Sequence, residues 1–205
     1  MSEPLSPVAR ARYGSAVSSP SPRRGRPARV STDDIVAAAV ALIDEIGLEA
    51  LTMRALAASM GIGPMTLYRH VADKQALLAL IPDALLVDVS TAACRKRVAL
   101  SALTTIAEGL AAVLQAHSGS VKLFEQPSQG PNMGAAARHV IGLLVAEGMT
   151  PDEARVALRA VIAQVIGEVL TMHRAVDLQG VDLLLDGVRA RLDGTRASES
   201  KRSEP

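Results

Sequence analysis

The sequence has very few aromatic residues and a single cysteine. Its only aromatic side chains are Tyr13, Tyr68 and Phe124, and tryptophan is absent. A core without aromatics must be built from aliphatic side chains, and Ala, Leu and Met among these are strong helix formers. The composition therefore favours an all-α fold over a β-sandwich or barrel. Because Cys94 is alone, an intrachain disulfide and a cysteine-clustered zinc site are excluded.

Long uncharged runs are also missing. The longest stretch without Asp, Glu, Lys or Arg is Ala55–Tyr68, which Gly61, Gly63 and Pro64 interrupt. A membrane span needs about 18 or more apolar residues, and no apolar signal segment follows the N-terminal arginines. The sequence therefore predicts a cytoplasmic protein with no membrane partner.

The charge that is present is unevenly distributed. Residues 1–31 carry six arginines against one acid, whereas residues 32–90 carry three basic and eight acidic residues. A basic arm in front of an acidic body suggests a polyanion as the partner of the arm, and the alternative is a solvated tail. Because residues 1–30 are rich in Ser, Pro, Arg and Gly, we expect a disordered basic arm there, and a disordered tail at 194–205.

Residues 31–80 predict a series of short helices. Apolar residues recur at helical spacing from Ile35 to Ile46, and a second helix follows. A third helix runs to about His70. A fourth begins at Lys74, and Pro82 should kink or restart this fourth helix. The residues that mark the helix starts, ends and turns are Ser31, Gly47, Thr52, the run Gly61-Ile62-Gly63, Pro64 and Asp73.

The remainder predicts only helices, at about 97–117, 120–125, 134–147, 151–174 and 180–193. The helix from Pro151 is apolar nearly all round, which indicates burial on most sides. The last helix carries an apolar stripe, made by Val181, Leu184, Leu185, Val188 and Leu192. Because a small helical domain cannot easily cover both surfaces itself, we expect a homodimer held by the last two long helices.

The second and third helices, joined by a glycine-bearing turn, are typical of a helix-turn-helix unit. Met65 and Leu67 are expected to turn inward. The exposed face of the third helix would then present a hydroxyl, a phenol, a guanidinium and an imidazole, from Thr66, Tyr68, Arg69 and His70. These groups suit phosphate and base-edge contacts in the major groove of DNA.

Three motifs carry a resemblance to a known family. The stretch GLEALTMRALA at 47–57, the turn at 61–63 and TLYRHVADKQALL at 66–78 resemble the DNA-binding domain of TetR-family transcriptional regulators. Asp182–Gly187 resembles, more loosely, the ligand-binding region of the tetracycline-repressor branch. The resemblance implies an all-helical homodimer that represses transcription and leaves its operator when a small apolar or amphipathic inducer binds the C-terminal domain.

The resemblance also implies a domain organisation and a set of DNA contacts. The arm at 1–30 would precede a helix-turn-helix domain at 31–80, a ligand-binding and dimerisation domain at 81–193 and the tail. Thr52 is in any case a helix cap. The other motif positions also have structural alternatives: Tyr68 as a core aromatic, His70 as a helix end and Lys74 as a solvated lysine. The expected contacts with double-stranded DNA are Thr52, Arg54, Thr66, Tyr68, Arg69, His70 and Lys74.

The arm contains its own short motif. The run at 23–27, RRGRP, resembles an AT-hook core, in which Arg24 and Arg26 would lie in a narrow A·T minor groove. Arginines are drawn to the strong negative potential of such a groove. The alternative is a tail that binds phosphates without regard to sequence.

No catalytic or metal-binding constellation is found in the sequence. The four histidines are far apart, and no nucleophile, acid–base pair or phosphate loop accompanies them, so we expect no enzyme, metal or cofactor. Where the tetracycline-repressor branch holds a drug-chelated metal with a histidine, this chain has Lys122. We therefore do not expect a metal–tetracycline inducer.

Polar residues on otherwise apolar helices are candidates for the ligand pocket. These are His117, Arg138, His139, Gln164, Glu168 and His173, with Phe124 and Met172 as apolar walls. In the alternative interpretation, Gln164 and Glu168 form a solvent strip or a dimer contact. The competing function is a ligand-independent architectural dimer, which would have a filled core.

The charge distribution generates a prediction about the arm. Each phosphate neutralised contributes about −0.9 to the slope of log K against log salt. If the arginines of the arm contact the DNA backbone, deleting residues 1–30 should flatten this slope by about two to four units. If the arm is a minor-groove hook, the deletion should in addition reduce the preference of the protein for operators with A·T-rich flanks. Affinities of both proteins over a salt series, on A·T and G·C flanks, make the test, and identical slopes would show that the arm does not participate.

Overall fold

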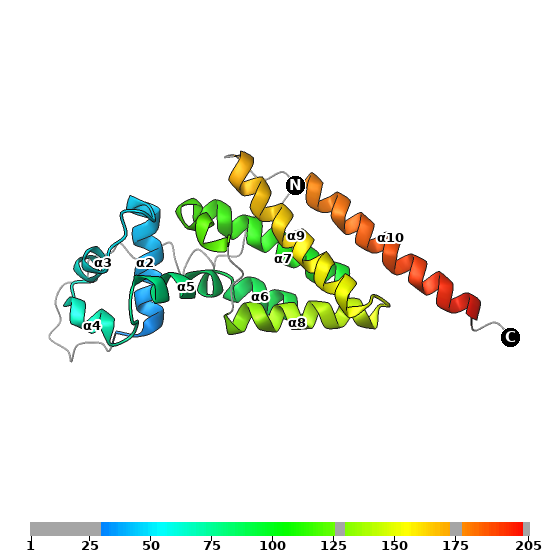
Figure 1. Cartoon of the computed structure of the whole chain (residues 1–205), viewed down its shortest axis with the longest axis horizontal. Helices are drawn as coiled ribbons and strands as arrows, with labels where there is room; N and C mark the ends of the chain where they lie inside the picture. Colours follow the sequence, from blue (N-terminus) through cyan, green and yellow to red (C-terminus); the bar gives the residue numbers. More distant parts are fainter. Residues whose placement is uncertain (1–29, 126–129, 173–177, 203–205) are drawn as a thin grey trace. The chain divides into compact units, whose positions relative to one another are not determined.

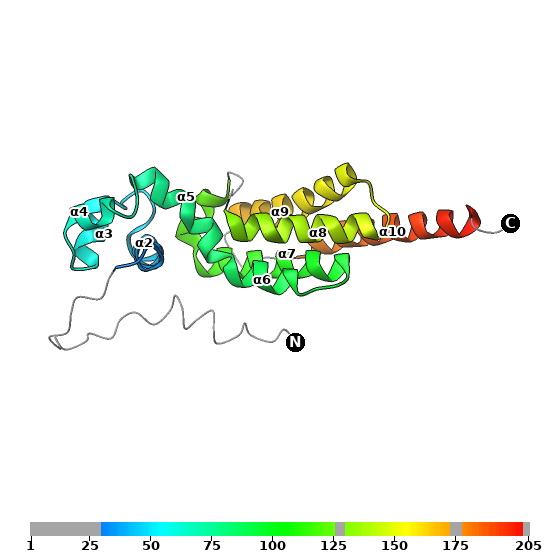
Figure 2. The ribbon, with the colours of Figure 1, turned by 90° about the horizontal axis from the view of Figure 1, so that it is seen from below.

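The structure is a computed structural model that describes residues 30–125, 130–172 and 178–202, without the side chains of Met172 and residues 196–202. All regular structure in these ranges is helical, which confirms the all-α prediction (Figures 1 and 2). The predicted basic arm, with Arg24 and Arg26, lies outside the described residues. The chain divides into two compact units, one ending at Ile81 and the other beginning at Pro82.

The first unit holds α2 (Thr32–Ile46), α3 (Met53–Ser59), α4 (Pro64–Tyr68) and most of α5 (Lys74–Leu85). Ser31 caps α2 as predicted: its Oγ accepts from the Asp34 N–H at 3.1 Å, and the Asp34 carboxylate accepts from the Ser31 N–H at 2.9 Å. At the other end Gly47 has φ +83° and ψ 157°. The positive φ was predicted, but ψ lies outside the left-handed helical region, in a conformation open almost only to glycine.

The second unit holds α6 (Val87–Cys94), α7 (Ala99–Ala116), the 3-10 helix η1 (Ser118–Phe124), α8 (Pro131–Ala146), α9 (Pro151–Met172) and α10 (Gln179–Arg202). Apart from α6 and the end of α10, these bounds lie within three residues of the predicted ones. The central helix is α7, which packs against α6, α8, α9 and α10. A Cβ on Gly109 of α7 would lie 2.7 Å from both methyl groups of Val89 on α6, so this pair packs in close approach.

The apolar character of α7 follows from its place in the core. In the described part of the chain, α7 is the one helix long and apolar enough to cross a membrane, and α5 with α6 would add a second only as a joined pair. Core helices meet the same criterion, and the buried face of α7 runs along its length from Ala99 to Leu114.

Pro82 does not end its helix. α5 continues to Leu85, and a separate helix, α6, then begins, which the sequence did not predict. Asp83, nearly buried, caps the start of α8: its carboxylate accepts from the Met133 N–H at 2.9 Å and from the Asn132 side-chain amide at 2.8 Å. A Cβ on Gly130 would lie about 2 Å from the Asp83 side chain, so the carboxylate can reach the helix end only because residue 130 is glycine.

The C-terminal prediction was wrong on two points. The last helix was expected to end at 193, but α10 continues through Gly194 to Arg202. The apolar stripe of this helix was expected to form the dimer interface, but Val181, Leu185, Val188 and Leu192 are buried inside the unit, where α10 packs against α9 and α7.

Contacts with Glu153 and Gly148, which are distant in the sequence, hold the C-terminal part of α10. The Arg191 guanidinium donates to the Glu153 carboxylate at 2.8 Å and to the Thr195 hydroxyl at 2.7 Å. The Thr195 methyl group packs so closely against Gly148 that a Cβ there would lie 2.6 Å from it. A glycine inside a helix costs only about 1 kcal/mol relative to alanine, and these contacts offset that cost at Gly194.

The pairing of Glu153 predicts a dependence of stability on pH. The Thr150 N–H, then Arg191 and the Thr150 hydroxyl, lower the pKa of Glu153 from 4.5 to about 2. Because the pKa is lower in the folded protein, this contribution to stability is complete above pH 4.5 and is lost as the pH falls toward 2. In Glu153→Gln the free energy of unfolding should fall less steeply across this range. Chemical denaturation at a series of pH values measures it, and a slope equal to that of wild type would contradict the assignment.

Candidate DNA-binding surface

The surface is built around α4, a helix of five residues. Gly61, with φ +65°, makes the turn after α3, and Pro64 occupies the first turn of α4. Leu67 is fully buried and fixes the orientation of the helix in the first unit. An isolated helix of this length is unstable in water, so α4 depends on the packing of Leu67. Because Leu67 is directed into the core, the opposite face of α4 is directed toward solvent.

Four of the predicted contacts lie on α4 or directly after it. Tyr68 is 47% exposed, Arg69 and His70 are exposed, and Thr66 is half-buried. The helix ends at Tyr68, so Arg69 and His70 lie just after its last turn rather than inside it.

The sequence interpretation missed Met65. It was expected to turn inward, but its side chain is 73% exposed, and it lies three residues before Tyr68 on the same face. An exposed methionine beside polar contact residues can pack against a thymine methyl group in the major groove. The exposure of Met65 could have been predicted from the length of the helix, because a helix of five residues has one inward position and Leu67 fills it.

Thr52 and Arg54 lie at the start of α3. The Thr52 hydroxyl accepts from the Ala55 N–H at 3.0 Å, which confirms its predicted role as N-cap. This leaves the hydroxyl proton free to meet a phosphate oxygen, and Arg54, two residues on, is exposed.

Lys74 is half-buried at the start of α5, which Asp73 caps as predicted through the Ala76 N–H at 2.7 Å. The Lys74 ammonium donates to the Leu48 carbonyl, with 3.5 Å between nitrogen and oxygen. It therefore supports the loop after α2 within its own unit. An ammonium has three N–H donors, so this bond leaves donors for a phosphate.

The charges of the described part of this unit, residues 30–81, do not attract DNA from a distance. Residues 30–81 contain three basic residues, Arg54, Arg69 and Lys74, against six acids. Salt screens such charges beyond about 8–10 Å, so the three cations act only after close docking.

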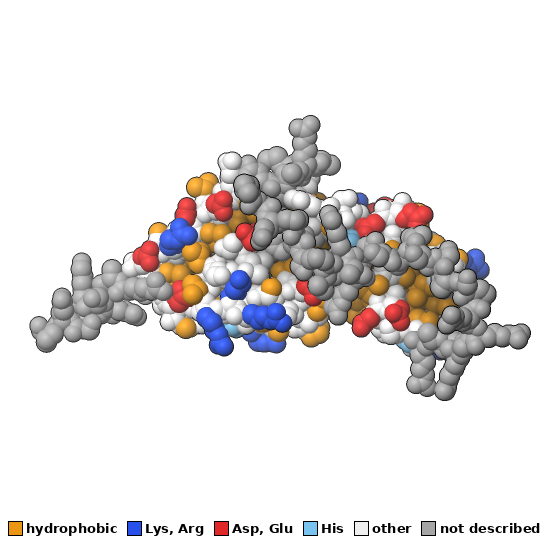
Figure 3. Space-filling view, turned by 180° about the vertical axis from the view of Figure 1, so that it is seen from behind, with side chains coloured by type: hydrophobic (Ala, Val, Ile, Leu, Met, Phe, Trp, Pro, Cys, Tyr) orange, Lys and Arg blue, Asp and Glu red, His pale blue; other side chains and the backbone are white. Residues whose placement is uncertain are grey.

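Three of the predicted ligand residues make hydrogen bonds within the second unit. His139 hydrogen-bonds to the Lys96 carbonyl at 2.9 Å, and the Gln164 amide donates to Glu168 at 2.7 Å, so these polar groups satisfy each other or the backbone. Phe124 is buried, His117 is half-buried and Arg138 is exposed. Arg138 belongs to the basic side chains of the second unit, some of which gather on the back face in Figure 3. The Met172 side chain and His173 lie outside the described residues.

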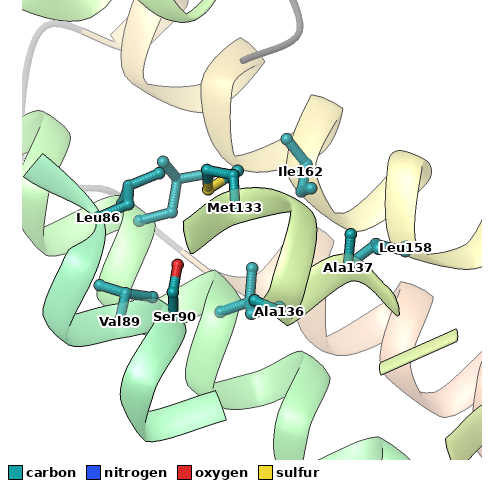
Figure 4. A pocket seen from close by; sticks show the side chains of 10 residues that line it. Leu86, Val89, Ser90, Met133, Ala136, Ala137, Leu158 and Ile162 are labelled. Atoms are coloured by element: carbon teal, nitrogen blue, oxygen red, sulfur yellow. The ribbon is translucent and has the colours of Figure 1, made fainter. Parts of the chain in front are cut away.

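A small cavity lies elsewhere in the second unit, between α6, α7, α8 and α9 (Figure 4). Its volume is about 20 Å³, and the one polar side chain among its described lining residues is that of Ser90. Among the residues whose side chains are described, the lining is formed by Leu86, Val89, Ser90, Ile106, Leu110, Met133, Ala136, Ala137, Leu158 and Ile162, and it includes none of the predicted ligand residues. Within the described ranges, no three His, Cys, Asp or Glu side chains come close enough to share a metal ion.

Comparison with known proteins matches this chain to a family of DNA-binding regulators. Residues 35–81 match the family described as "Bacterial regulatory proteins, tetR family". The tetracycline repressor protein class G of Vibrio anguillarum is 34% identical over 149 residues, which span 66% of each chain. The aligned segments cover between 27% and 66% of the lengths of the curated relatives.

Solved structures extend the similarity over the second unit. TetR-Q116A of Acinetobacter baumannii AYE in complex with minocycline has a TM-score of 0.65 and 25% identity, covering 86% of this chain and 99% of its own. BioQ with its double-stranded DNA operator has a TM-score of 0.60 and 27% identity, covering 78% and 99%.

The exposed face of α4 yields a direct test. Tyr68→Ala and Thr66→Ala should each weaken binding to the operator by about 1–3 kcal/mol, the range for a lost base contact, and leave the fold intact. Affinity at fixed salt measures the effect, and circular dichroism controls for folding. Leu67→Ala is the contrasting variant, because loss of this buried side chain should cost about 2–5 kcal/mol of stability. Unchanged affinity in both surface variants would remove Thr66 and Tyr68 from the site.

Proposed function

The chain belongs to the TetR family of bacterial regulatory proteins, and from this membership we propose that it is a ligand-responsive transcriptional repressor. The first unit binds the operator, and a small molecule bound in the second unit releases it. The observation that carries the proposal is the exposed face of α4. There the side chains of Met65 and Tyr68, and of Arg69 directly after the helix, are exposed to solvent and do not pack into the core. Since its target is genomic DNA, we place its action in the cytoplasm.

Within this function, the DNA contacts divide into two groups. Thr52, Arg54 and Lys74 lie at helix starts and supply hydrogen bonds and positive charge for phosphates, which set the register of the protein on the duplex. Tyr68 and Met65 extend from α4 toward base edges, and a phenol hydroxyl and a thioether chain suit base edges and thymine methyl groups. Thr66, in the middle of α4, and Arg69 and His70, directly after its last turn, add hydrogen-bond donors to this second group.

We propose that the protein is a homodimer through the outward faces of α9 and α10. On α10, Leu183 is 75% exposed and is followed at helical spacing by Gly187, Ala190 and Gly194. On α9, Val156 and Leu170 are exposed at either end of a row whose middle holds Ala160, Ala163 and Gly167. A Cβ added at Gly167, Gly187 or Gly194 would meet nothing within 4 Å, so both rows are open to a partner helix. A dimer also suits two operator half-sites.

The ligand-independent architectural dimer remains the second candidate because the cavity is small. A volume of about 20 Å³ is close to a filled core. The unpartnered hydroxyl of Ser90 in its wall favours ligand binding instead. The two functions differ in one measurable property, which is whether a small molecule changes the affinity for the operator.

The decisive experiment is a footprint of the purified protein on the promoter region next to its own gene. A protected, dyad-symmetric segment supports the repressor, and absence of protection there and across the neighbouring promoters would overturn it. Small molecules that lift the protection would identify the inducer class. Protection that no compound changes would support the architectural dimer.

Two leucines of α10, two residues apart and on opposite faces of the helix, test the dimer. Leu183→Glu should give monomers that keep their helicity, because the side chain is exposed in the protomer. Leu185→Glu should instead unfold the second unit, because this side chain is only 6% exposed and a buried unpaired charge costs several kcal/mol. Sedimentation velocity reports the assembly state and circular dichroism the fold. A Leu183→Glu protein that sediments as an intact dimer would exclude this face.

A further inference from the structure

Ser90 differs from three threonines of the described α-helices in the bonding of its hydroxyl. Thr91, Thr104 and Thr171 each return the hydroxyl proton to a backbone carbonyl one turn back, at 2.7–3.0 Å. Ser90, on the same helix as Thr91, is 4% exposed, and its Oγ has no hydrogen-bond partner. Leaving a buried hydroxyl unpaired costs about 1–3 kcal/mol, so this orientation needs an explanation.

The hydroxyl of Ser90 points into the cavity. Figure 4 shows its oxygen directed toward the space between Leu86, Met133 and Ala136. The other described lining residues are aliphatic or thioether, and none of them is charged. A water molecule in this space would need two to four polar partners, and Ser90 is the single polar side chain of the walls.

We propose that this cavity is the inducer site, and that Ser90 is its polar anchor for a neutral, mostly apolar small molecule with one oxygen acceptor. The proposal rests on the ligand-responsive function proposed above. The ligand supplies the acceptor that the Ser90 proton lacks. An anionic ligand is disfavoured, because no cation in the lining offsets the loss of hydration of its charge.

The walls must part to admit such a molecule, and they differ in how easily they move. Val89 is held against Gly109, where a Cβ would lie only 2.7 Å from it, so the α6–α7 wall is closely packed. Met133 belongs to the α8 wall, and methionine has an unbranched, adaptable side chain. We therefore expect the α8 side, beginning at Met133, to yield when a ligand enters.

Three probes of similar size separate the chemical classes. Acetophenone carries a carbonyl oxygen, ethylbenzene replaces the carbonyl with a methylene group, and benzoate is anionic. Calorimetry gives the affinities, and a ¹³C-labelled methionine methyl group, assigned with Met133→Leu, reports whether binding occurs at the cavity. In the wild type we expect acetophenone and ethylbenzene to shift the Met133 signal and benzoate not to do so.

Ser90→Ala should lower the ratio of acetophenone to ethylbenzene affinity by about 3- to 10-fold, as expected for one hydrogen bond. The matched control is Ser120→Ala, because Ser120 is also fully buried and unpartnered but does not line the cavity. Its ratio should equal that of wild type. Ala137→Leu, which adds bulk to the lining, should weaken both neutral probes.

The result that overturns the proposal is an unchanged ratio in Ser90→Ala, benzoate binding as tight as acetophenone, or no shift of Met133 with any probe. Operator affinity, measured with and without acetophenone, separates this from the proposed function. Probe binding that depends on Ser90 but leaves operator affinity unchanged would retain the site and remove the ligand response. Intact operator binding without any probe binding would remove the site and retain the DNA-binding function.

Discussion

Close approach between helices is the constraint on which the second unit depends. With almost no aromatic side chains, its core cannot be filled by large planar groups, so aliphatic side chains must interlock at short range. Glycines allow close approach to one aliphatic side chain, where Gly109 meets Val89, and to three polar residues, where Gly130 meets Asp83, Gly148 meets Thr195 and Gly180 meets Gln164. A densely packed core responds to small changes of side-chain volume. A single hydroxyl in the cavity wall can therefore affect what the cavity binds.

The sequence predicted best what is determined locally. Ser31, Thr52 and Asp73 cap helices through residues three positions away, and the glycine turn and the buried Leu67 belong to one short motif. The helix-turn-helix unit could therefore be read directly from its residues. Met65 was misjudged because apolar character was taken for burial, although a five-residue helix has room for only one inward side chain.

What failed depends on contacts between residues far apart in the chain. Asp83 caps a helix that begins 48 residues later, and the end of α10 is held by Glu153 and Gly148. The stripe containing Leu185 did mark an apolar interface, but the chain supplies the opposite surface itself from α9 and α7. Of the polar residues expected around a ligand, His139 bonds to the distant backbone carbonyl of Lys96, and Gln164 bonds to Glu168 on its own helix. The buried hydroxyls without a partner in the described residues belong to Ser90 and Ser120, which no pattern had singled out.

The scarcity of aromatic residues has a spectroscopic consequence. The chain has no tryptophan, and Tyr68 is one of its two tyrosines, the other being Tyr13 in the arm. Its tyrosine emission therefore originates from the exposed face of α4 and from the arm, and the core of the second unit adds only the weak emission of Phe124. Intrinsic fluorescence would be nearly silent to unfolding of that unit, yet it would report directly on whatever approaches the surface of α4.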